Sequence, residues 1–284
     1  MKRNLKLLSH AKVNLRLEIL KKREDGYHEI RTIFQKISLH DTIRFSLKEV
    51  QGISITTNEP DLPVGKSNLV YRAAQAILNH SAYRGGISIH IEKRIPLGAG
   101  LGGGSSNAAT TLKALNHLLK MGLSQKEMMT MGVKIGADVP FFCLEKGAIA
   151  TGIGERLKEI DLPALWYVLI YPNFEVSTRW AYQNTRLTKE KFRYKIHKFL
   201  TTPEAISKVL MNGLEEVVSE KFPQIHVMKE VLRSQGALGS LMTGSGPTVF
   251  GIYVDEKNAA SAYGNIRRSV TGKGWLVIRA HSLP

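Results

Sequence analysis

A run of glycines near the middle of the chain has the composition of a phosphate-binding loop. Five glycines fall within residues 98–104, and Ser105 and Ser106 follow directly. Glycine lets the backbone approach a ligand closely, and the N-terminus of a following helix adds a partial positive charge. A flexible linker is the alternative interpretation. It is disfavoured because an alternating strand precedes the loop and a capped helix is expected after it, over residues 105–119.

The residues around the glycines distinguish between the known types of phosphate-binding loop. Gly98, Gly100 and Gly103 fit the dinucleotide fingerprint, but no acidic residue ends a second strand about 20 residues later, where a ribose partner belongs. The Walker A motif is excluded because no Lys-Ser or Lys-Thr pair follows. The hydroxyls of Ser105 and Ser106 remain available to contact phosphate or magnesium.

A carboxylate with the setting of a general base follows the predicted loop. Asp138 lies between Gly136 and Pro140, with apolar neighbours on both sides. A carboxylate held there can accept a proton from a substrate hydroxyl, which accelerates a reaction roughly 10²- to 10⁴-fold. Spacing alone favours the simpler interpretation of a turn or helix-cap aspartate.

The first predicted strand places two polar side chains on one face. Lys12 and Asn14 alternate with Val13 and Leu15, so they point to the opposite side from these apolar residues. A lysine directed into a site favours an ionised Asp138 and neutralises a transferring phosphoryl group. Taken alone, an exposed strand lysine is the more common case.

Two further turns carry candidate residues. The turn at residues 26–29 presents Tyr27 and His28, and residues 243–248 form a second glycine-rich turn before a predicted strand. Each also fits an ordinary surface turn.

The expected elements indicate an α+β fold, because strands dominate the first part and the second part is mixed. The domain boundary is expected near residue 161, giving domains 1–160 and 161–284. Strands are predicted at residues 12–19, 30–39, 42–47, 52–57, 86–92, 148–153, 166–171, 248–253 and 275–278. Helices are predicted at residues 68–80, 105–119, 124–135, 202–219 and 222–234.

Composition excludes several classes of protein. The 284 residues are 43% hydrophobic and 23% charged, with 40 Lys+Arg against 24 Asp+Glu, a formal net charge of +16 and one cysteine. That balance is typical of a globular chain without disulfides or a CxxC zinc site. No apolar stretch is long enough to span a membrane, and the basic N-terminus lacks the features of a leader, so a cytoplasmic protein is expected. His-Glu-x-x-His and Gly-x-Ser-x-Gly are absent.

Together the motifs resemble the superfamily of small-molecule kinases named for galactokinase, homoserine kinase, mevalonate kinase and phosphomevalonate kinase. The resemblance covers residues 9–252 and rests on residues 11–15, 25–29, 96–108, 136–140 and 242–249. It implies an N-terminal mixed-sheet ATP-binding domain and a C-terminal ferredoxin-like α/β sandwich domain. The Gly-Tyr-His motif is similar to that of members which phosphorylate the 2-hydroxyl of a cytidine diphosphate ester of methylerythritol, in the non-mevalonate route to isoprenoid precursors.

The resemblance also implies a role for each matched residue. Asp138 matches a catalytic base and Lys12 its partner. The ATP phosphate loop matches Pro96, Gly98, Ala99, Gly100, Leu101, Gly102, Gly103, Gly104, Ser105 and Ser106. The substrate-binding matches are Tyr27 and His28 at the cytosine, Tyr182 as a second ring, Thr178 near the sugar, Asn14 beside the methylerythritol group and Phe34 near the nucleotide. ATP and Mg²⁺ are the implied cofactors, the chain itself offers no metal site, and a monomer or weak homodimer is expected.

Two alternatives remain open. One is another kinase of the superfamily acting on mevalonate, homoserine or a sugar, although these substrates offer no base for Tyr27, His28 and Tyr182 to contact. The other is a basic nucleic-acid-binding protein that uses the cations of residues 186–198, which are interleaved with aromatic residues. The prediction is that no nucleic acid and no membrane is bound.

Overall fold

The computed structural model describes residues 3–188 and 200–283, and it divides into two compact units that are each assembled from several stretches of chain. The first unit comprises the residues up to Ala11, His40–Ile95 and Gly102–Glu145. The second unit comprises Lys12–Leu39, Pro96–Leu101 and the residues from Lys146 on. Strands β1 (Asn4–Lys22) and β2 (His28–Lys48) contribute residues to both units. The domain boundary expected near residue 161 stays a prediction.

The sheet of the first unit contains strands β3 (Gly52–Thr57) and β4 (Gly86–Glu92) beside the later part of β2. β3 runs parallel to β4, and β4 runs antiparallel to residues 42–48 of β2. The alternating isoleucines of β4 are all buried, which confirms the period of two in the sequence.

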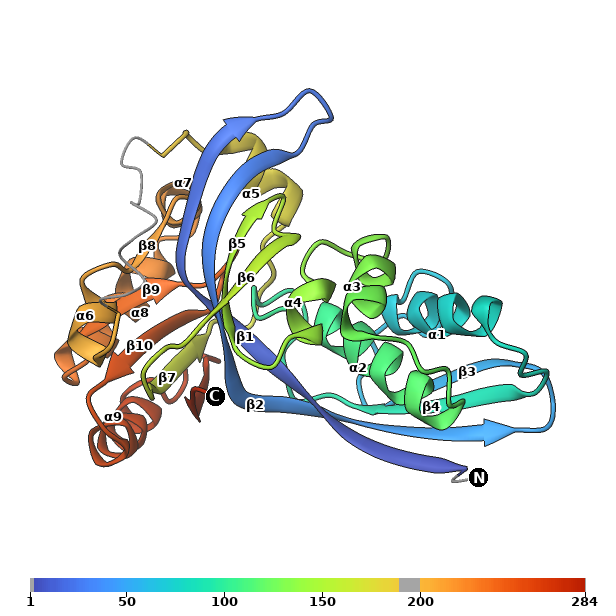
Figure 1. Ribbon diagram of the computed structural model, residues 1–284. Coiled ribbons are helices and arrows are strands. Elements are labelled where there is room, and N and C mark those ends of the chain that lie inside the picture. Colours follow the sequence, from blue (N-terminus) through green and yellow to red (C-terminus); the bar gives the residue numbers. More distant parts are fainter. Residues whose placement is uncertain (1–2, 189–199, 284) are drawn as a thin grey trace. The chain divides into compact units, whose positions relative to one another are not determined.

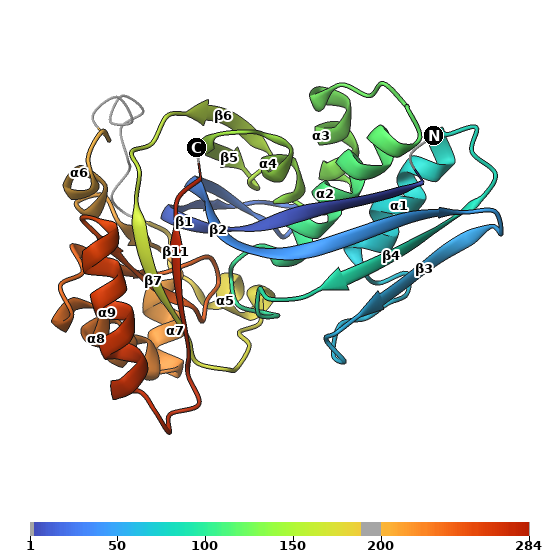
Figure 2. The same ribbon diagram turned by 90° about the horizontal axis from the view of Figure 1, so that it is seen from below.

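Helices cover one face of this sheet (Figure 1, Figure 2). They are α1 (Leu69–His80), α2 (Gly103–Leu118), α3 (Gln125–Val133) and α4 (Val139–Cys143). The Asn68 side chain accepts a hydrogen bond from Val70 N at 2.8 Å and so caps α1, as its sequence predicts. Ser124 and Glu127 form a reciprocal capping box at the start of α3. These caps fix where the two helices begin.

The second unit contains strands of the seven-stranded sheet to which β3 and β4 also belong, and a separate four-stranded sheet. In the first, β5 (Gly147–Gly152) pairs antiparallel with residues 30–34 of β2 and with β6 (Arg156–Ile160). The short strand β8 (Met211–Asn212) pairs parallel with β1. This sheet therefore carries the β1–β2 hairpin that contains Tyr27 and His28.

The other sheet has the strand order β11-β7-β10-β9, and every pairing in it is antiparallel. Its strands are β7 (Trp166–Tyr171), β9 (Gly239–Met242), β10 (Val249–Tyr253) and β11 (Leu276–His281). Helices α8 (Gln224–Ser234) and α9 (Glu256–Ser269) pack on one face in a common apolar cluster (Figure 2). This order, with its β-α-β-β-α-β sequence, confirms the expected ferredoxin-like sandwich.

The single helix predicted over residues 202–219 is wrong. The structure has α6 (Pro203–Ser207), then β8, then α7 (Glu215–Lys221). The Asn212 side chain accepts from Leu214 N at 2.9 Å, and this local bond turns the chain where the apolar pattern suggested continuity. The predicted strands 30–39 and 42–47 belong to one strand, β2, and α5 (Thr178–Asn184) was not predicted.

Candidate active site

The glycine-rich loop uses left-handed backbone at three points before it enters α2. The φ angles are +57° at Gly98, +75° at Gly100 and +70° at Gly102, a region that strongly favours glycine. Gly102 is the N-cap of α2 and makes no side-chain cap hydrogen bond, so the expectation of a capped helix is wrong. The first helical bond runs from Ser106 N to Gly102 O at 2.9 Å. The amides just before Ser106 therefore remain as donors at a helix N-terminus, where an anion is favoured.

The remaining residues of the predicted phosphate loop differ in exposure. Ala99 and Leu101 are buried and anchor the loop, while Pro96 is half-buried. Gly104 is exposed, and a Cβ added there would meet no atom closer than 3.7 Å. The open part of the loop is therefore the part at the start of α2.

In the first unit, the start of α2 lies beside the turn that carries Asp138. A Cβ on Gly136 would be 3.8 Å from Ser105 Oγ, so this hydroxyl faces the turn. Asp138 is the half-buried N-cap of α4, and its side chain makes no cap hydrogen bond to that helix. Ser106 differs from Ser105, because its buried hydroxyl lies 2.8 Å from Ser9 Oγ. Of the two serines, Ser105 is the one beside the turn that carries Asp138.

In the second unit, Lys12 is fixed against the phosphate loop. Its side chain is 3% exposed, and its Nζ donates to Asn14 Oδ1 at 2.5 Å and to Gly100 O at 3.0 Å. The ammonium also lies 5.4 Å from the centroid of the Phe34 ring, within range of a cation–π interaction. The backbone N of Lys12 donates to Leu101 O at 3.0 Å. Lys12 is therefore a buried, positioned cation rather than a solvated strand lysine.

Asn14 joins the first strand to the C-terminal glycine-rich turn. Its backbone N donates to Thr243 Oγ1 at 2.9 Å, and its Nδ2 donates to Thr32 Oγ1 at 2.8 Å. A Cβ on Gly100 would lie 2.3 Å from Thr243 O, and one on Gly244 would lie 2.9 Å from Gly100 O. The two glycine-rich segments thus meet backbone to backbone, which accounts for glycine at both positions.

The β1–β2 hairpin presents the two aromatic candidates. Tyr27 is 60% exposed, and its backbone N donates to Asp25 Oδ1 at 3.0 Å, which shapes the turn. The His28 and Tyr182 rings have centroids 5.4 Å apart and planes inclined by 34°. Burial, and then the charge of Lys22, lower the pKa of His28 below its ordinary value of 6.5, so the imidazole is neutral at pH 7.

Helix α5 links that hairpin to the C-terminal turn. Thr178 is its first residue, and its Oγ1 lies 2.8 Å from Ser245 Oγ. Tyr182 follows four residues later on the same face of the helix. The structure therefore places Thr178 beside the turn and Tyr182 beside His28, and their roles at the sugar and at the cytosine stay predictions.

Two positioning residues were missed. Asn212 Nδ2 donates to Met242 O at 2.7 Å and to Gly244 O at 2.8 Å. One buried side-chain amide therefore holds the backbone on both sides of Thr243, where the glycine-rich turn begins. Glu215 Oε2 accepts from Met242 N at 2.7 Å. The Asn-Gly pair at residues 212–213 was the available signal, since it marks a turn, but its long-range contacts leave no trace in the sequence.

The structure brings Lys12, Asn14 and Phe34 together in the second unit, and His28 with Tyr182 in the same unit. Asp138 belongs to the first unit. The proximity of Lys12 and Asp138 stays a prediction.

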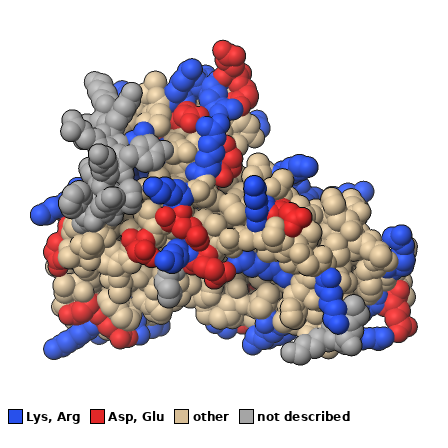
Figure 3. All heavy atoms as spheres, in the orientation of Figure 1, with Lys and Arg blue, Asp and Glu red and all other residues tan. Residues whose placement is uncertain are grey.

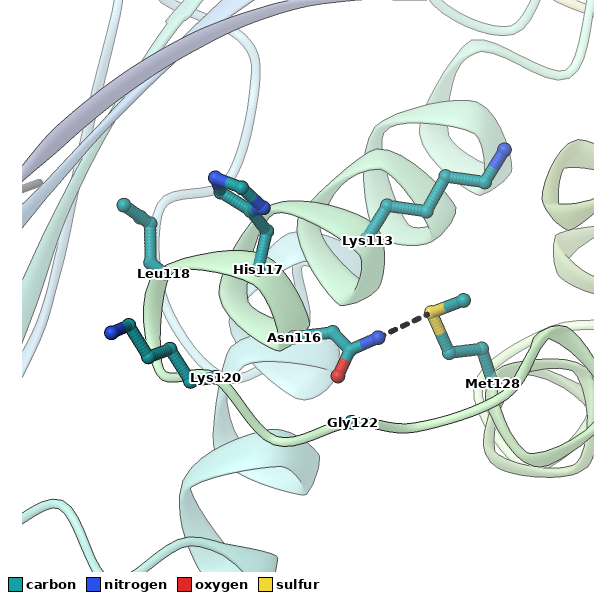
Figure 4. A pocket seen from close by; sticks show the side chains of 7 residues that line it. All are labelled: Lys113, Asn116, His117, Leu118, Lys120, Gly122 and Met128. Atoms are coloured by element: carbon teal, nitrogen blue, oxygen red, sulfur yellow. Dashed lines mark hydrogen bonds between the residues drawn. The ribbon is translucent and has the colours of Figure 1, made fainter.

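The described surface also has basic residues and hollows away from the glycine-rich loop. In the face drawn in Figure 3, lysines and arginines are interspersed with acidic residues, and most of the basic stretch expected for nucleic acid, residues 189–198, lies outside the described part. A hollow of about 490 Å³ is lined by Lys113, His117 and Lys120, but these side chains point away from one another (Figure 4). Among residues 3–188 and 200–283, no helix has both the length and the apolar composition to cross a membrane.

Comparison with known proteins assigns the chain. The family profile "GHMP kinases N terminal domain" matches residues 68–146, and "GHMP kinases C terminal" matches residues 197–271. A protein of Geobacter sp. (strain M21) named 4-diphosphocytidyl-2-C-methyl-D-erythritol kinase is 46% identical over 282 residues, covering 99% of this chain and 100% of the relative. The equally named protein of Syntrophus aciditrophicus (strain SB) is 47% identical over 284 residues, with 98% and 99% coverage.

Solved structures agree with this assignment. The crystal structure of a 4-(cytidine 5'-diphospho)-2C-methyl-D-erythritol kinase superposes with a TM-score of 0.84 at 34% identity, covering 99% of this chain and 100% of that one. A homoserine kinase from Cytophaga hutchinsonii shares the fold, with a TM-score of 0.77 at 20% identity and 99% and 95% coverage. The fold and the site thus define a small-molecule kinase of the GHMP class. Within that class, the chain belongs to the 4-diphosphocytidyl-2-C-methyl-D-erythritol kinase family.

Proposed function

We propose that this chain transfers the γ-phosphoryl group of ATP to the 2-hydroxyl of 4-diphosphocytidyl-2-C-methyl-D-erythritol, a step in the non-mevalonate route to isoprenoid precursors. One observation carries the proposal. A buried ammonium, that of Lys12, is held 3.0 Å from the carbonyl of Gly100 in the phosphate loop. A fixed cation at this loop is what phosphoryl transfer needs, because catalysis of this reaction is mainly positioning and charge stabilisation.

The two catalytic residues have complementary roles in this proposal. The Lys12 ammonium stabilises negative charge on the transferring group, and Asn14 holds that ammonium in place through a 2.5 Å hydrogen bond. Asp138 accepts the proton of the attacking hydroxyl. Transfer is direct and in line, so no phosphoenzyme forms.

The start of α2 suits a triphosphate, because Gly102 leaves its amides without a side-chain cap. Within residues 3–188 and 200–283, no group of three or more His, Cys, Asp or Glu residues could hold a metal ion. We therefore assign Mg²⁺ to the phosphate oxygens themselves, with few protein ligands, as is usual for this ion. Bound Mg²⁺ would neutralise phosphate charge, and Ser105, whose hydroxyl faces the Asp138 turn, could contact it.

Base recognition is assigned to the hairpin and α5. Tyr27 offers an exposed ring for stacking, Tyr182 offers a second ring, and stacking contributes about 1–3 kcal/mol per base. Neutral His28 provides hydrogen bonding that can distinguish cytosine from uracil. Thr178 lies at the sugar, Asn14 beside the methylerythritol group and Phe34 near the nucleotide.

The wider assignments follow from the same proposal. Residues 1–160 carry the ATP site and also contribute Asn14, Tyr27, His28 and Phe34, and residues 161–284 complete the site of the second substrate with Thr178 and Tyr182. The enzyme works in the cytoplasm as a monomer or weak homodimer, and it uses neither nucleic acid nor a membrane.

The test is ADP release with Mg-ATP and a panel of acceptors: the cytidine substrate, its uridine analogue, mevalonate and homoserine. We expect turnover on the cytidine substrate and little on the others. Turnover on mevalonate or homoserine instead would identify another kinase of the class. Turnover on none, together with salt-sensitive RNA binding, would overturn the kinase assignment.

A further inference from the structure

The phosphate loop carries a carboxylate on its surface at Gly98. A Cβ built on Gly98 would lie 2.5 Å from both Cγ and Cδ of Glu175 and 2.8 Å from its Cβ, so the Glu175 side chain rests directly on this glycine. Glu175 is exposed, and within residues 3–188 and 200–283 its carboxylate makes no ion pair. The charge is therefore not neutralised by a described neighbour.

The chain on both sides of Glu175 is anchored. Before it, the hydroxyl of Tyr171 donates to Leu97 O at 3.2 Å, next to Gly98. After it, Val176 is buried and Ser177 caps α5. These contacts fix the backbone around residue 175 beside the loop.

The position has an electrostatic consequence for any ligand of the loop. A carboxylate within several ångströms of a bare polyphosphate repels it, and Lys12 on the same loop attracts it. A bound divalent cation turns the repulsion by the carboxylate into attraction, because Mg²⁺ is commonly bound by one or two carboxylates together with phosphate oxygens.

We propose that Glu175 makes nucleotide binding depend on a divalent cation, by opposing the bare nucleotide and by interacting, directly or through water, with the cation of the Mg-nucleotide. The inference rests on the proposed function, since it requires that the loop binds ATP. Glu175, three positions before Thr178, would then distinguish the nucleotide with a bound divalent cation from the nucleotide without one.

The experiment compares wild type with Glu175→Gln, which keeps the shape of the side chain on Gly98 and removes its charge. The control is Glu220→Gln, which removes the same charge from an exposed position on α7. ADP binding is measured by calorimetry in excess Mg²⁺ and in EDTA, so that the readout is affinity and not turnover.

In Glu175→Gln we expect the affinity for bare ADP to rise, with no gain for Mg-ADP, so that the Mg²⁺ dependence of binding shrinks about tenfold. The control should keep the wild-type ratio. An unchanged ratio in Glu175→Gln overturns the role of Glu175 and leaves the kinase assignment standing. If wild-type protein binds ADP in neither buffer, the proposed function fails, and this inference fails with it.

Discussion

Replacing Lys12 by methionine tests whether the charge of Lys12 serves catalysis or the stability of the fold. Methionine has similar length and bulk but no charge, so packing beside Phe34 is largely kept. The change leaves Asn14 Oδ1 and Gly100 O without the ammonium, which donates to them at 2.5 and 3.0 Å. Each hydrogen bond to a charged group contributes about 1.5–3 kcal/mol to stability.

The loss of stability is nevertheless small. Lys12 is only 3% exposed, and burying an ammonium has a desolvation cost of several kcal/mol, which the methionine variant no longer bears. The two effects oppose each other, so we expect the free energy of unfolding to change by less than about 2 kcal/mol. Turnover should fall about 10²- to 10³-fold, the usual consequence of removing one preorganised electrostatic group, about 2.7–4 kcal/mol in the barrier.

The assay combines kcat from ADP release with the free energy of unfolding from urea titration. Lys113→Met is the control, because Lys113 forms an ion pair with Glu145 and its side chain is 32% exposed. That variant should change the free energy of unfolding by about 1 kcal/mol or less while kcat stays within about twofold of wild type, since it removes a partly exposed ion pair. A Lys12→Met protein that is folded and keeps kcat within about tenfold of wild type would refute the reasoning.

Four further predictions follow from the site. Asp138→Asn should lower kcat at least about 10²-fold with ATP affinity kept, and near-normal kcat would exclude it as the base. Tyr27→Ala should raise the KM of the cytidine substrate by about 5- to 150-fold and hardly affect that of ATP; equal effects on both would place the base elsewhere. Because burial lowers the pKa of His28 below 6.5, the imidazole is mostly neutral at pH 7 and gains its proton as the pH falls further. The KM of the cytidine substrate should therefore change little from pH 8 to 7 and rise at lower pH, and a rise already between pH 8 and 7 contradicts the assignment. Gly100→Ala should destabilise the protein by about 1–3 kcal/mol or more, from its φ of +75° and a Cβ 2.3 Å from Thr243 O, and an unchanged urea midpoint would show that the loops do not meet as described.

Local patterns account for what could be predicted of the fold. The helix at 68–80 and the strand at 86–92 were found because capping and periodicity act within a few residues. The helix expected at 202–219 failed because the side-chain bond of Asn212 and the pairing of β8 with β1 override an apolar period. Tertiary contacts decide such cases, and they are not local.

The same distinction applies to the site. The period of two on the first strand correctly placed Lys12 and Asn14 on one side, where they share a hydrogen bond. The contact of Asn14 with Thr243 spans 229 positions, and no spacing rule predicts it. The candidate residues came from the resemblance to known kinases, and the contacts that hold Lys12 and Asn14 in place are seen only in the structure.

The N-terminus of α2, which has no side-chain cap, has a consequence for engineering. A serine or aspartate cap is worth about 1 kcal/mol to an ordinary helix, and Gly102 provides no such side chain. A serine or aspartate at this position would be strained by the φ of +70°, and it would place an oxygen where, in the proposed function, the amides receive a phosphate. In that proposal the ligand itself serves as the cap, so the start of this helix should resist local unfolding better when nucleotide is bound than when it is absent.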